Sequence, residues 1–213
     1  MNNWISKTKL HFKDRAFLVS VGISILFLIL SFFINFYAGS YATKSASNSV
    51  TDIVLSNIRV YDVDAIFIYG PIIFWIFIAI LLLIEPKRIP FTLKSIALFT
   101  IIRAIFISLT HIGPFPTALI IDPNKIMEKF AFGGDLFFSG HTGLPFLMAL
   151  VFWNIKPLRY MFLFLSVMFG VVVLLGHIHY SIDVLSAFFI TYTIFHICNY
   201  LFKKDRILFF KSM

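Results

Sequence analysis

Long uncharged segments, separated by short polar connections, make up most of the chain. Five segments contain about 20 or more consecutive uncharged residues, and a sixth is interrupted by Lys94 near its start and by Arg103. Because about 20 mostly apolar residues cross a bilayer as a helix, the pattern predicts six membrane-spanning helices. The predicted spans are 16–38, 65–84, 91–112, 141–154, 160–176 and 181–202, of which the fourth is short.

These segments are apolar on all sides, whereas surface helices of soluble proteins are amphipathic. The composition agrees, because 60% of the residues are hydrophobic, 13% are charged and the mean hydropathy is +0.93. Cys198 is the single cysteine, which excludes an internal disulfide. We therefore expect an all-α, polytopic membrane protein with a six-transmembrane-helix bundle. Its expected parts are a cytoplasmic N-terminal arm (1–15), a membrane catalytic domain (16–202) and a cytoplasmic basic tail (203–213).

Basic residues are distributed unevenly between the two ends of these spans. Thirteen lie on the N-terminal arm, the second and fourth connections and the C-terminal tail, and four lie on the other side: Lys44, Arg59, Lys125 and Lys129. Since cytoplasmic loops are enriched in Lys and Arg, both termini are predicted to be cytoplasmic. The net charge of +8 is then mainly a signal of topology, and no nucleic-acid partner is expected. The first span is longer than the apolar part of a signal peptide, which favours an uncleaved anchor.

Two residues near the start of the last span, His179 and Asp183, are four positions apart and share one face of a helix that includes both. A carboxylate there can accept the proton of one imidazole nitrogen and leave the other nitrogen free to attack an electrophile. Alone the pair is weak evidence for catalysis, because two residues at this spacing can also form a helix-capping pair or make an interhelical hydrogen bond.

The segment Ser139-Gly140-His141 is a glycine-containing turn at the start of the fourth span. Free backbone N–H groups at a helix start bind anions such as phosphate, and His141 beside them can protonate a leaving oxygen. A simple capped turn is the alternative. Arg103 lies inside the third span, and its planar guanidinium is suited to bind two phosphate oxygens. The alternatives are that its head group reaches the membrane interface or pairs with an acid such as Asp135.

Together these residues predict phosphoryl transfer on a lipid: one histidine attacks phosphorus, a carboxylate orients it, and a second histidine protonates the leaving alcohol. All of them are expected near the outer membrane face. No metal and no cofactor are needed. A metal site formed by His177, His179 and Asp183 is the rival interpretation, and it is weaker because residues two apart face different ways on a helix.

Two segments resemble motifs of the sphingomyelin synthase family, within the type 2 phosphatidic acid phosphatase superfamily. Residues 134–142 (GDLFFSGHT) resemble GDxxFSGHT, and residues 177–184 (HIHYSIDV) resemble HxHYTxDV. Arg103, Thr110, Pro114 and Pro116 resemble a third stretch, so that the similarity extends over roughly residues 65 to 202. Six spans with cytoplasmic termini also match that family.

The resemblance implies that His179 is the nucleophile, that Asp183 supports it, and that His141 acts first as acid and then as base. The predicted phosphate- or substrate-binding residues are Arg103, Asp135, Ser139, Gly140 and Tyr180. The implied reaction moves a phosphocholine or phosphoethanolamine head group from a glycerophospholipid donor to a lipid alcohol acceptor such as ceramide or diacylglycerol.

The phosphatases of the superfamily carry Ser-Arg shortly before the nucleophilic histidine and Lys-x6-Arg-Pro earlier. Here Val172 and Val173 stand in place of Ser-Arg, and Lys94 has no Arg-Pro seven residues on. This favours the synthase branch. A lipid phosphatase or phospholipase C-like hydrolase that uses water as acceptor is the nearest alternative, and a non-catalytic lipid-binding or transport protein is the second.

Overall fold

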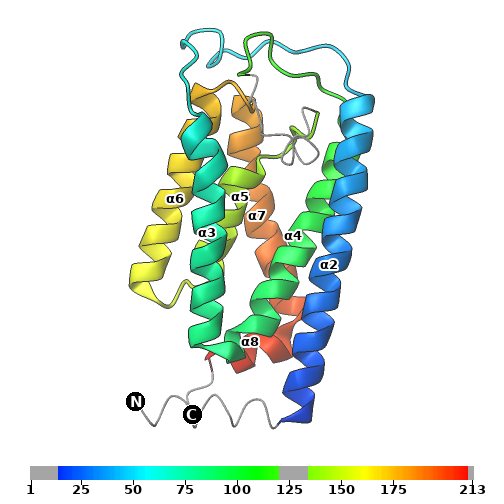
Figure 1. Cartoon of the computed structure of the whole chain (residues 1–213), viewed down its shortest axis with the longest axis vertical. Coiled ribbons are helices and arrows are strands. Elements are labelled where there is room, and N and C mark those ends of the chain that lie inside the picture. Colours follow the sequence, from blue (N-terminus) through cyan, green and yellow to red (C-terminus); the bar gives the residue numbers. More distant parts are fainter. Residues whose placement is uncertain (1–13, 120–133, 211–213) are drawn as a thin grey trace.

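The computed structural model describes residues 14–119 and 134–210, and this part of the chain is all-helical (Figure 1). It contains seven α-helices and one short 3₁₀ helix: α2 (Arg15–Lys44), α3 (Asp64–Ile84), η1 (Pro86–Arg88), α4 (Ile89–Leu109), α5 (Gly140–Val151), α6 (Lys156–Leu175), α7 (Ser181–Leu201) and α8 (Lys203–Phe210). No strand is found within those ranges. The predicted all-α membrane fold is confirmed.

Five helical segments are long and apolar enough to cross a membrane, namely α2, α3, η1 with α4, α6 and α7. The predicted fourth span corresponds to α5, which has 12 residues. At 1.5 Å per residue, α5 is about 18 Å long, shorter than a bilayer core of about 30 Å. Most of its residues are buried, because α5 packs against α4, α6 and α7. Helix α5 therefore lies inside the bundle, and the longer helices around it present apolar side chains to the outside.

Helix α2 continues to Lys44, six residues beyond the predicted end at position 38. It packs along α4, and its buried positions are mostly small: Phe17, Ser24, Ser31, Gly39 and Ala42. Their intervals of seven, seven, eight and three residues keep them on one face, where small side chains permit close approach of two membrane helices. The opposite face of α2 is lined by exposed apolar side chains, as expected for contact with lipid.

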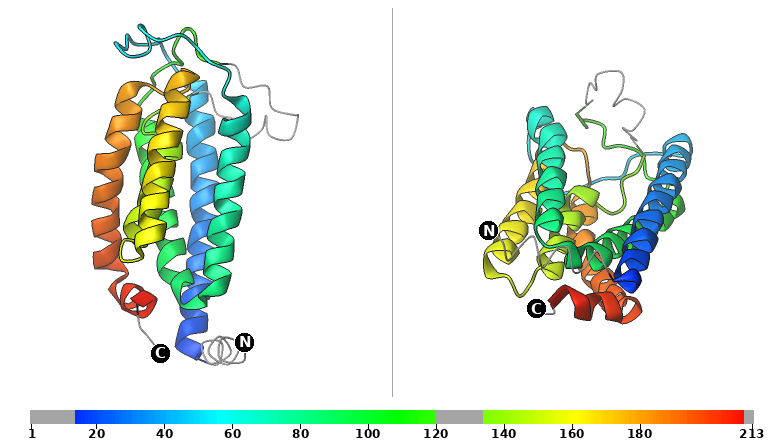
Figure 2. Two further views of the ribbon diagram at one scale, coloured as in Figure 1. Left: turned by 90° about the vertical axis from the view of Figure 1, so that its left-hand side faces the viewer. Right: turned by 60° about the horizontal axis from the view of Figure 1, so that its bottom comes forward.

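One end of the bundle carries the loop 45–63 and the loop 110–119, and the other end carries α8, which lies across the ends of the long helices (Figures 1 and 2). We call these the loop end and the α8 end. Helix α8 falls within the expected basic tail. Its Asp205 forms an ion pair with Lys94 of α4 at 2.6 Å and accepts from Ser20 of α2. Arg206 donates to the carbonyl of Val151 at 2.7 Å, at the last residue of α5. The segment is thus an ordered helix that joins α2, α4 and α5.

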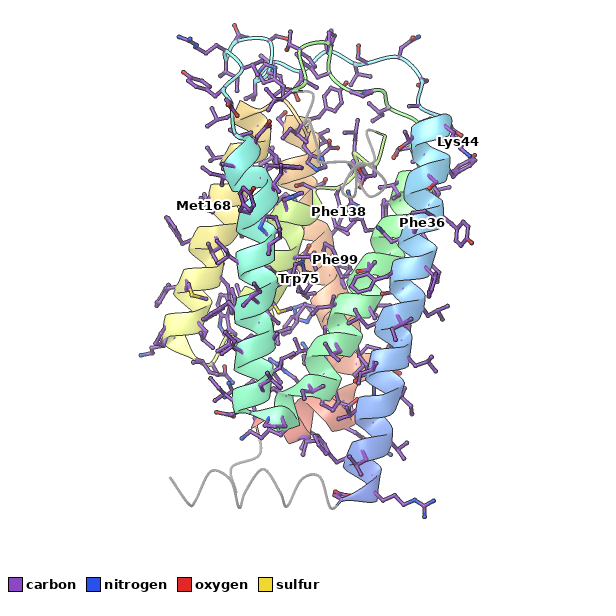
Figure 3. All side chains as sticks on the ribbon, viewed as in Figure 1. Phe36, Lys44, Trp75, Phe99, Phe138 and Met168 are labelled. Carbon is purple, nitrogen blue, oxygen red and sulfur yellow. The ribbon has the colours of Figure 1, made fainter. Side chains whose placement is uncertain are left out.

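The interior of the bundle is rich in phenylalanine. Phe99 of α4 and Phe138, labelled in Figure 3, meet edge to face with ring centroids 5.4 Å apart. Both side chains are almost fully buried, and they belong to a cluster that also includes Leu147 and Met148 of α5. This apolar packing fixes the start of α5 against α4, and that start carries the candidate site.

Candidate active site

Ser139 caps the start of α5. Its hydroxyl oxygen accepts from the backbone N–H of Thr142 at 3.3 Å and from the Thr142 hydroxyl at 3.2 Å. A serine hydroxyl has one proton to donate and two lone pairs to accept with, so both bonds use the oxygen and leave the proton for another acceptor. The capped-turn interpretation of this motif is correct, and it is compatible with a phosphate contact.

His179 and Asp183 face one another at the start of α7. The Nδ1 atom of His179 lies 3.4 Å from Oδ2 of Asp183, which also accepts from the backbone N–H of Tyr180 at 2.9 Å. Asp183 is completely buried and His179 is nearly so. The carboxylate therefore both caps the helix and faces one imidazole nitrogen, which leaves Nε2 of His179 as the nitrogen directed elsewhere.

The two histidine motifs are joined through their backbones. The N–H of Ser139 donates to the carbonyl of Asp183 at 3.1 Å, so the start of α5 is fixed against the first turn of α7. The imidazole of His141 consequently lies near that of His179, with ring centroids 6.5 Å apart and planes inclined by 59°. A gap of this size fits one tetrahedral phosphorus between two ring nitrogens.

Arg103 of α4 binds the segment that precedes α5. Its Nε donates to the carbonyl of Phe138 at 2.8 Å, one terminal nitrogen lies 3.2 Å from Oδ2 of Asp135, and the other donates to the Asp135 carbonyl at 2.6 Å. The predicted pairing of Arg103 with Asp135 is present. Since a guanidinium has five N–H donors, these three bonds leave two for a phosphate.

Gly140 allows Arg103 to lie against the start of α5. A Cβ atom at position 140 would lie 3.3 Å from the Arg103 Nε, so a larger residue would require the guanidinium to shift by a few tenths of an ångström. The positive end of the α5 dipole and the arginine charge thus coincide, and this combination attracts an anion.

The start of α7 is electrostatically different, because two carboxylates already occupy it. Besides Asp183, Asp52 from the loop 45–63 accepts from the backbone N–H of Ser181 at 2.7 Å and from the Ser181 hydroxyl at 2.8 Å. Burial raises the pKa of Asp52, but bonds from Ser181, Leu55 and Val54 together lower it below its ordinary value. Of the two helix starts, that of α5 therefore has the electrostatics that favour an anion.

Tyr180 connects this site to the loops. Its hydroxyl donates to the carbonyl of Gly113 at 2.8 Å and accepts from the N–H of Val50 at 3.2 Å. Burial, with Asp183 and Asp52 nearby, raises the pKa of Tyr180, which keeps the hydroxyl protonated as a donor. The substrate-binding role of Tyr180 stays a prediction, and its contacts are with the loop end.

His177 has separate partners. Its Nδ1 lies 2.7 Å from the Thr117 hydroxyl, and its ring meets the edge of Phe115, with centroids 5.4 Å apart. His177 and His179 thus contact different groups. Among residues 14–119 and 134–210, no cluster of three or more His, Cys, Asp and Glu side chains is placed to hold a metal ion.

The pattern of the sequence did not indicate the contribution of α3. The ring of Phe67 stacks on His141, with centroids 4.3 Å apart and planes inclined by 26°, and Phe169 of α6 meets the same imidazole at 6.4 Å. Asp52 was also missed. An aspartate two and three residues before the amides it caps, Val54 and Leu55, is a recognisable turn signal, but it does not reveal the bond to Ser181.

Residues 133–200, about a third of the chain, match the family model described as PAP2 superfamily C-terminal. The matched segment contains α5, α6 and nearly all of α7, with both histidine motifs. No curated protein and no solved structure matches the chain. The match supports the type 2 phosphatidic acid phosphatase superfamily, without distinguishing its sphingomyelin synthase branch, and so supports an enzyme that acts on lipid phosphates.

Proposed function

We propose that the protein is a membrane phosphotransferase that moves a phospho-alcohol head group from a glycerophospholipid to a lipid alcohol. The head group is phosphocholine or phosphoethanolamine, and the acceptor is ceramide or diacylglycerol. The observation that supports this most directly is the 6.5 Å separation of the His141 and His179 rings, with Asp183 behind the second. Two histidines across one phosphorus serve as nucleophile and as proton donor.

In the first half-reaction, Nε2 of His179 attacks the donor phosphorus. A P–N bond forms, the P–O bond to diacylglycerol breaks, and His141 gives its proton to the departing oxygen. Charge on the non-bridging oxygens is stabilised by the two remaining N–H groups of Arg103 and by the first amides of α5. Asp183 stabilises the positive charge that develops on His179.

In the second half-reaction, the acceptor hydroxyl enters where diacylglycerol left. His141, now neutral, removes its proton, the new P–O bond forms, and the P–N bond to His179 breaks. Both histidines return to their starting states, so no other reactant is consumed. The same steps with water as acceptor give hydrolysis.

The position of Lys94 supports transfer rather than the chemistry of the phosphatase signature. Lys94 is nine residues before Arg103 on α4, about 13 Å along the helix, and it pairs with Asp205 at the α8 end. Val172 and Val173 are buried apolar residues where phosphatases have Ser-Arg. The cationic groups of the phosphatase site are therefore not supplied by these three positions.

The experiment uses purified protein in nanodiscs with head-group-labelled phosphatidylcholine, with and without ceramide or diacylglycerol. A new labelled phospholipid that forms only when acceptor is present supports transfer. Release of the head group at the same rate with and without acceptor supports the hydrolase. The variant H179A should abolish both products. H196A is the matched control, because His196 is a lipid-exposed histidine of α7 outside the site. Activity that survives H179A would favour the non-catalytic alternative.

We also propose that the site lies on the extracytoplasmic side, with both termini in the cytoplasm. The excess of Lys and Arg at the α8 end supports this orientation. In a C198A background, single cysteines at Thr51 and at Lys203 test it in intact cells with a membrane-impermeant thiol reagent. Labelling at position 51 alone is expected, and labelling at position 203 alone would reverse the orientation.

A further inference from the structure

His179 lies in the connection between α6 and α7, outside both helices. Helix α6 ends at Leu175, and α7 begins at Ser181, after its N-cap residue Tyr180. The backbone N–H of His179 donates to the carbonyl of Val173 at 3.4 Å, which is long for a hydrogen bond. The position of the proposed nucleophile therefore depends on how the first residues of α7 are held.

Two carboxylates from different elements hold those residues. Oδ2 of Asp183, within α7, accepts from the N–H of Tyr180 at 2.9 Å and lies 3.4 Å from Nδ1 of His179. Asp52, from the loop 45–63, accepts from the N–H of Ser181 at 2.7 Å and from its hydroxyl at 2.8 Å. The first N–H groups of a helix have no partner within it, and bonds to a charged acceptor are strong. Successive amides at the start of α7 are thus bound by one internal and one external carboxylate.

Asp52 is itself held in place. Its side chain is almost fully buried, and its other oxygen accepts from the N–H groups of Val54 at 2.8 Å and Leu55 at 3.1 Å. The Leu55 side chain is also buried, and it packs in a small cluster with Tyr180 and with Leu136, which precedes α5. The segment that carries Asp52 therefore contacts both chain segments that carry the site histidines.

We propose that Asp52 is a positioning residue for His179, acting through the amide and hydroxyl of Ser181 at the start of α7. This inference rests on the proposed function. Asp183 can orient the His179 imidazole only while the first turn of α7 is in place, and Asp52 holds that turn from outside the helix. A displacement of about 1 Å can cost about 10²-fold in rate, so a small shift of this turn is enough to slow the attack on phosphorus.

A second bond joins the same loop to this region, but it acts at a different point. The N–H of Val50 donates to the hydroxyl of Tyr180 at 3.2 Å. That bond ends on the tip of a long side chain, so it holds the ring of Tyr180 and not the main chain of α7. Asp52 binds the main chain directly at Ser181. The backbone next to His179 therefore depends on Asp52 more than on Val50.

The test is the variant D52N, which is nearly isosteric but has one oxygen acceptor and one NH₂ donor. If the amide oxygen stays with Val54 and Leu55, the NH₂ group faces the N–H of Ser181, and two donors cannot bond. We expect kcat for head-group transfer to fall about tenfold, which is less than the loss for a shift of about 1 Å. KM for the donor should change little, because the phosphate is bound at the start of α5.

D62N is the matched control. Asp62 is an exposed aspartate of the same loop, and it accepts from the N–H of Asp64 at 3.1 Å at the start of α3. An asparagine oxygen can accept that bond equally well, so the wild-type rate is expected. All rates are measured in nanodiscs at a temperature at which D52N is fully folded, so that a loss of stability does not lower them. A wild-type kcat in D52N overturns the proposal.

A second pair of variants tests the contact from the side of Ser181. S181A removes the hydroxyl bond to Asp52 and keeps the amide bond, so kcat should fall about threefold, less than in D52N. S181T keeps both bonds and should retain the wild-type rate. This pair decides the question if D52N does not fold. Equal rates in S181A and S181T would show that the contact with Asp52 does not govern His179, and the proposal is then wrong.

The position of the His179 ring is also measurable without turnover. Its ring ¹⁵N signals, identified by their loss in H179N, should change in D52N and not in D62N. A lower rate in D52N with unchanged signals would mean that Asp52 stabilises the fold without orienting the ring, which overturns the proposal. If the wild type neither transfers nor hydrolyses while D52N alters these signals, the proposed function fails and the role of Asp52 in orienting His179 stands.

Discussion

Replacing Arg103 by lysine tests the electrostatic part of the site most directly. The guanidinium makes three hydrogen bonds at once, to the carbonyl of Phe138 and to the carboxylate and carbonyl of Asp135. A lysine has three donors on a single nitrogen and cannot reach both residues and a phosphate in one geometry. R103K keeps the positive charge, so any loss of activity is caused by the loss of the planar guanidinium and its hydrogen bonds, not by the loss of charge.

The expected magnitude follows from the donors that disappear. Removing one preorganised donor to a developing oxyanion costs about 10²–10³ in kcat, or about 2.7–4 kcal/mol. Arg103 has two N–H groups left for the substrate, and it also fixes the segment before α5, whose first amides bind the same phosphate. We therefore expect kcat for R103K to fall at least 10²-fold, near the lower figure for a single donor, with a smaller change in KM.

The assay measures initial rates of head-group transfer in nanodiscs over a range of donor and acceptor concentrations. R59K is the matched control, because Arg59 is an exposed arginine in the loop 45–63. D135N, which keeps an oxygen acceptor for Arg103, should lose much less activity than R103K. Wild-type kcat in R103K would show that the guanidinium fork does not contact the transition state, and the assignment of the phosphate to the start of α5 would then be wrong.

Four further results are expected. The transfer rate should be bell-shaped in pH, since His179 must be neutral while His141 is protonated; a plain sigmoid between about pH 5 and pH 9 would contradict the two-histidine assignment. The pKa of Asp52 lies below its ordinary value of 3.8, so its stabilisation is complete above that pH and lost as the pH falls through the folded pKa; the advantage of wild type over D52N in Tm should therefore shrink below about pH 4. Y180F removes the hydroxyl partner of the Gly113 carbonyl and of the Val50 N–H and should cost about 1–3 kcal/mol of stability in thermal unfolding, and an unchanged Tm would refute this. EDTA should leave activity intact, whereas loss with EDTA and recovery with a metal ion would revive the metal interpretation.

The sequence predicted most of the helices and the proximity of His141 to His179, because both follow from local patterns. Uncharged runs determine where helices lie, and His179 and Asp183 are close in sequence. The expected helix containing both is wrong, however, because α7 begins at Ser181 and His179 precedes the N-cap Tyr180. The bond between the Ser139 N–H and the Asp183 carbonyl joins segments 44 positions apart, yet the two motifs already implied that their histidines meet.

Contacts made by elements without a motif were not predictable in this way. Asp52 meets Ser181 across 129 positions, and Phe67 meets His141 from a helix whose pattern is only apolar. The end of α2 was placed too early, because Gly39 reads as a stop in isolation but is buried in the packing of α2 along α4. Helix α8 was missed because eight residues with four charges suggest a solvated tail, whereas Phe209 is buried and Arg206 caps α5.

The main-chain bond from Ser139 to Asp183 has a consequence for how such an enzyme diversifies. It sets the interval between the two imidazoles through main-chain groups that every residue type except proline possesses, so mutation of neighbouring side chains leaves this interval unchanged. Selection for a different alcohol or a different lipid can then act on the lipid-facing helices while the bond-breaking step is preserved. Redesign of head-group preference should for that reason start from α3 and α6, and leave the backbones at both ends of this bond untouched.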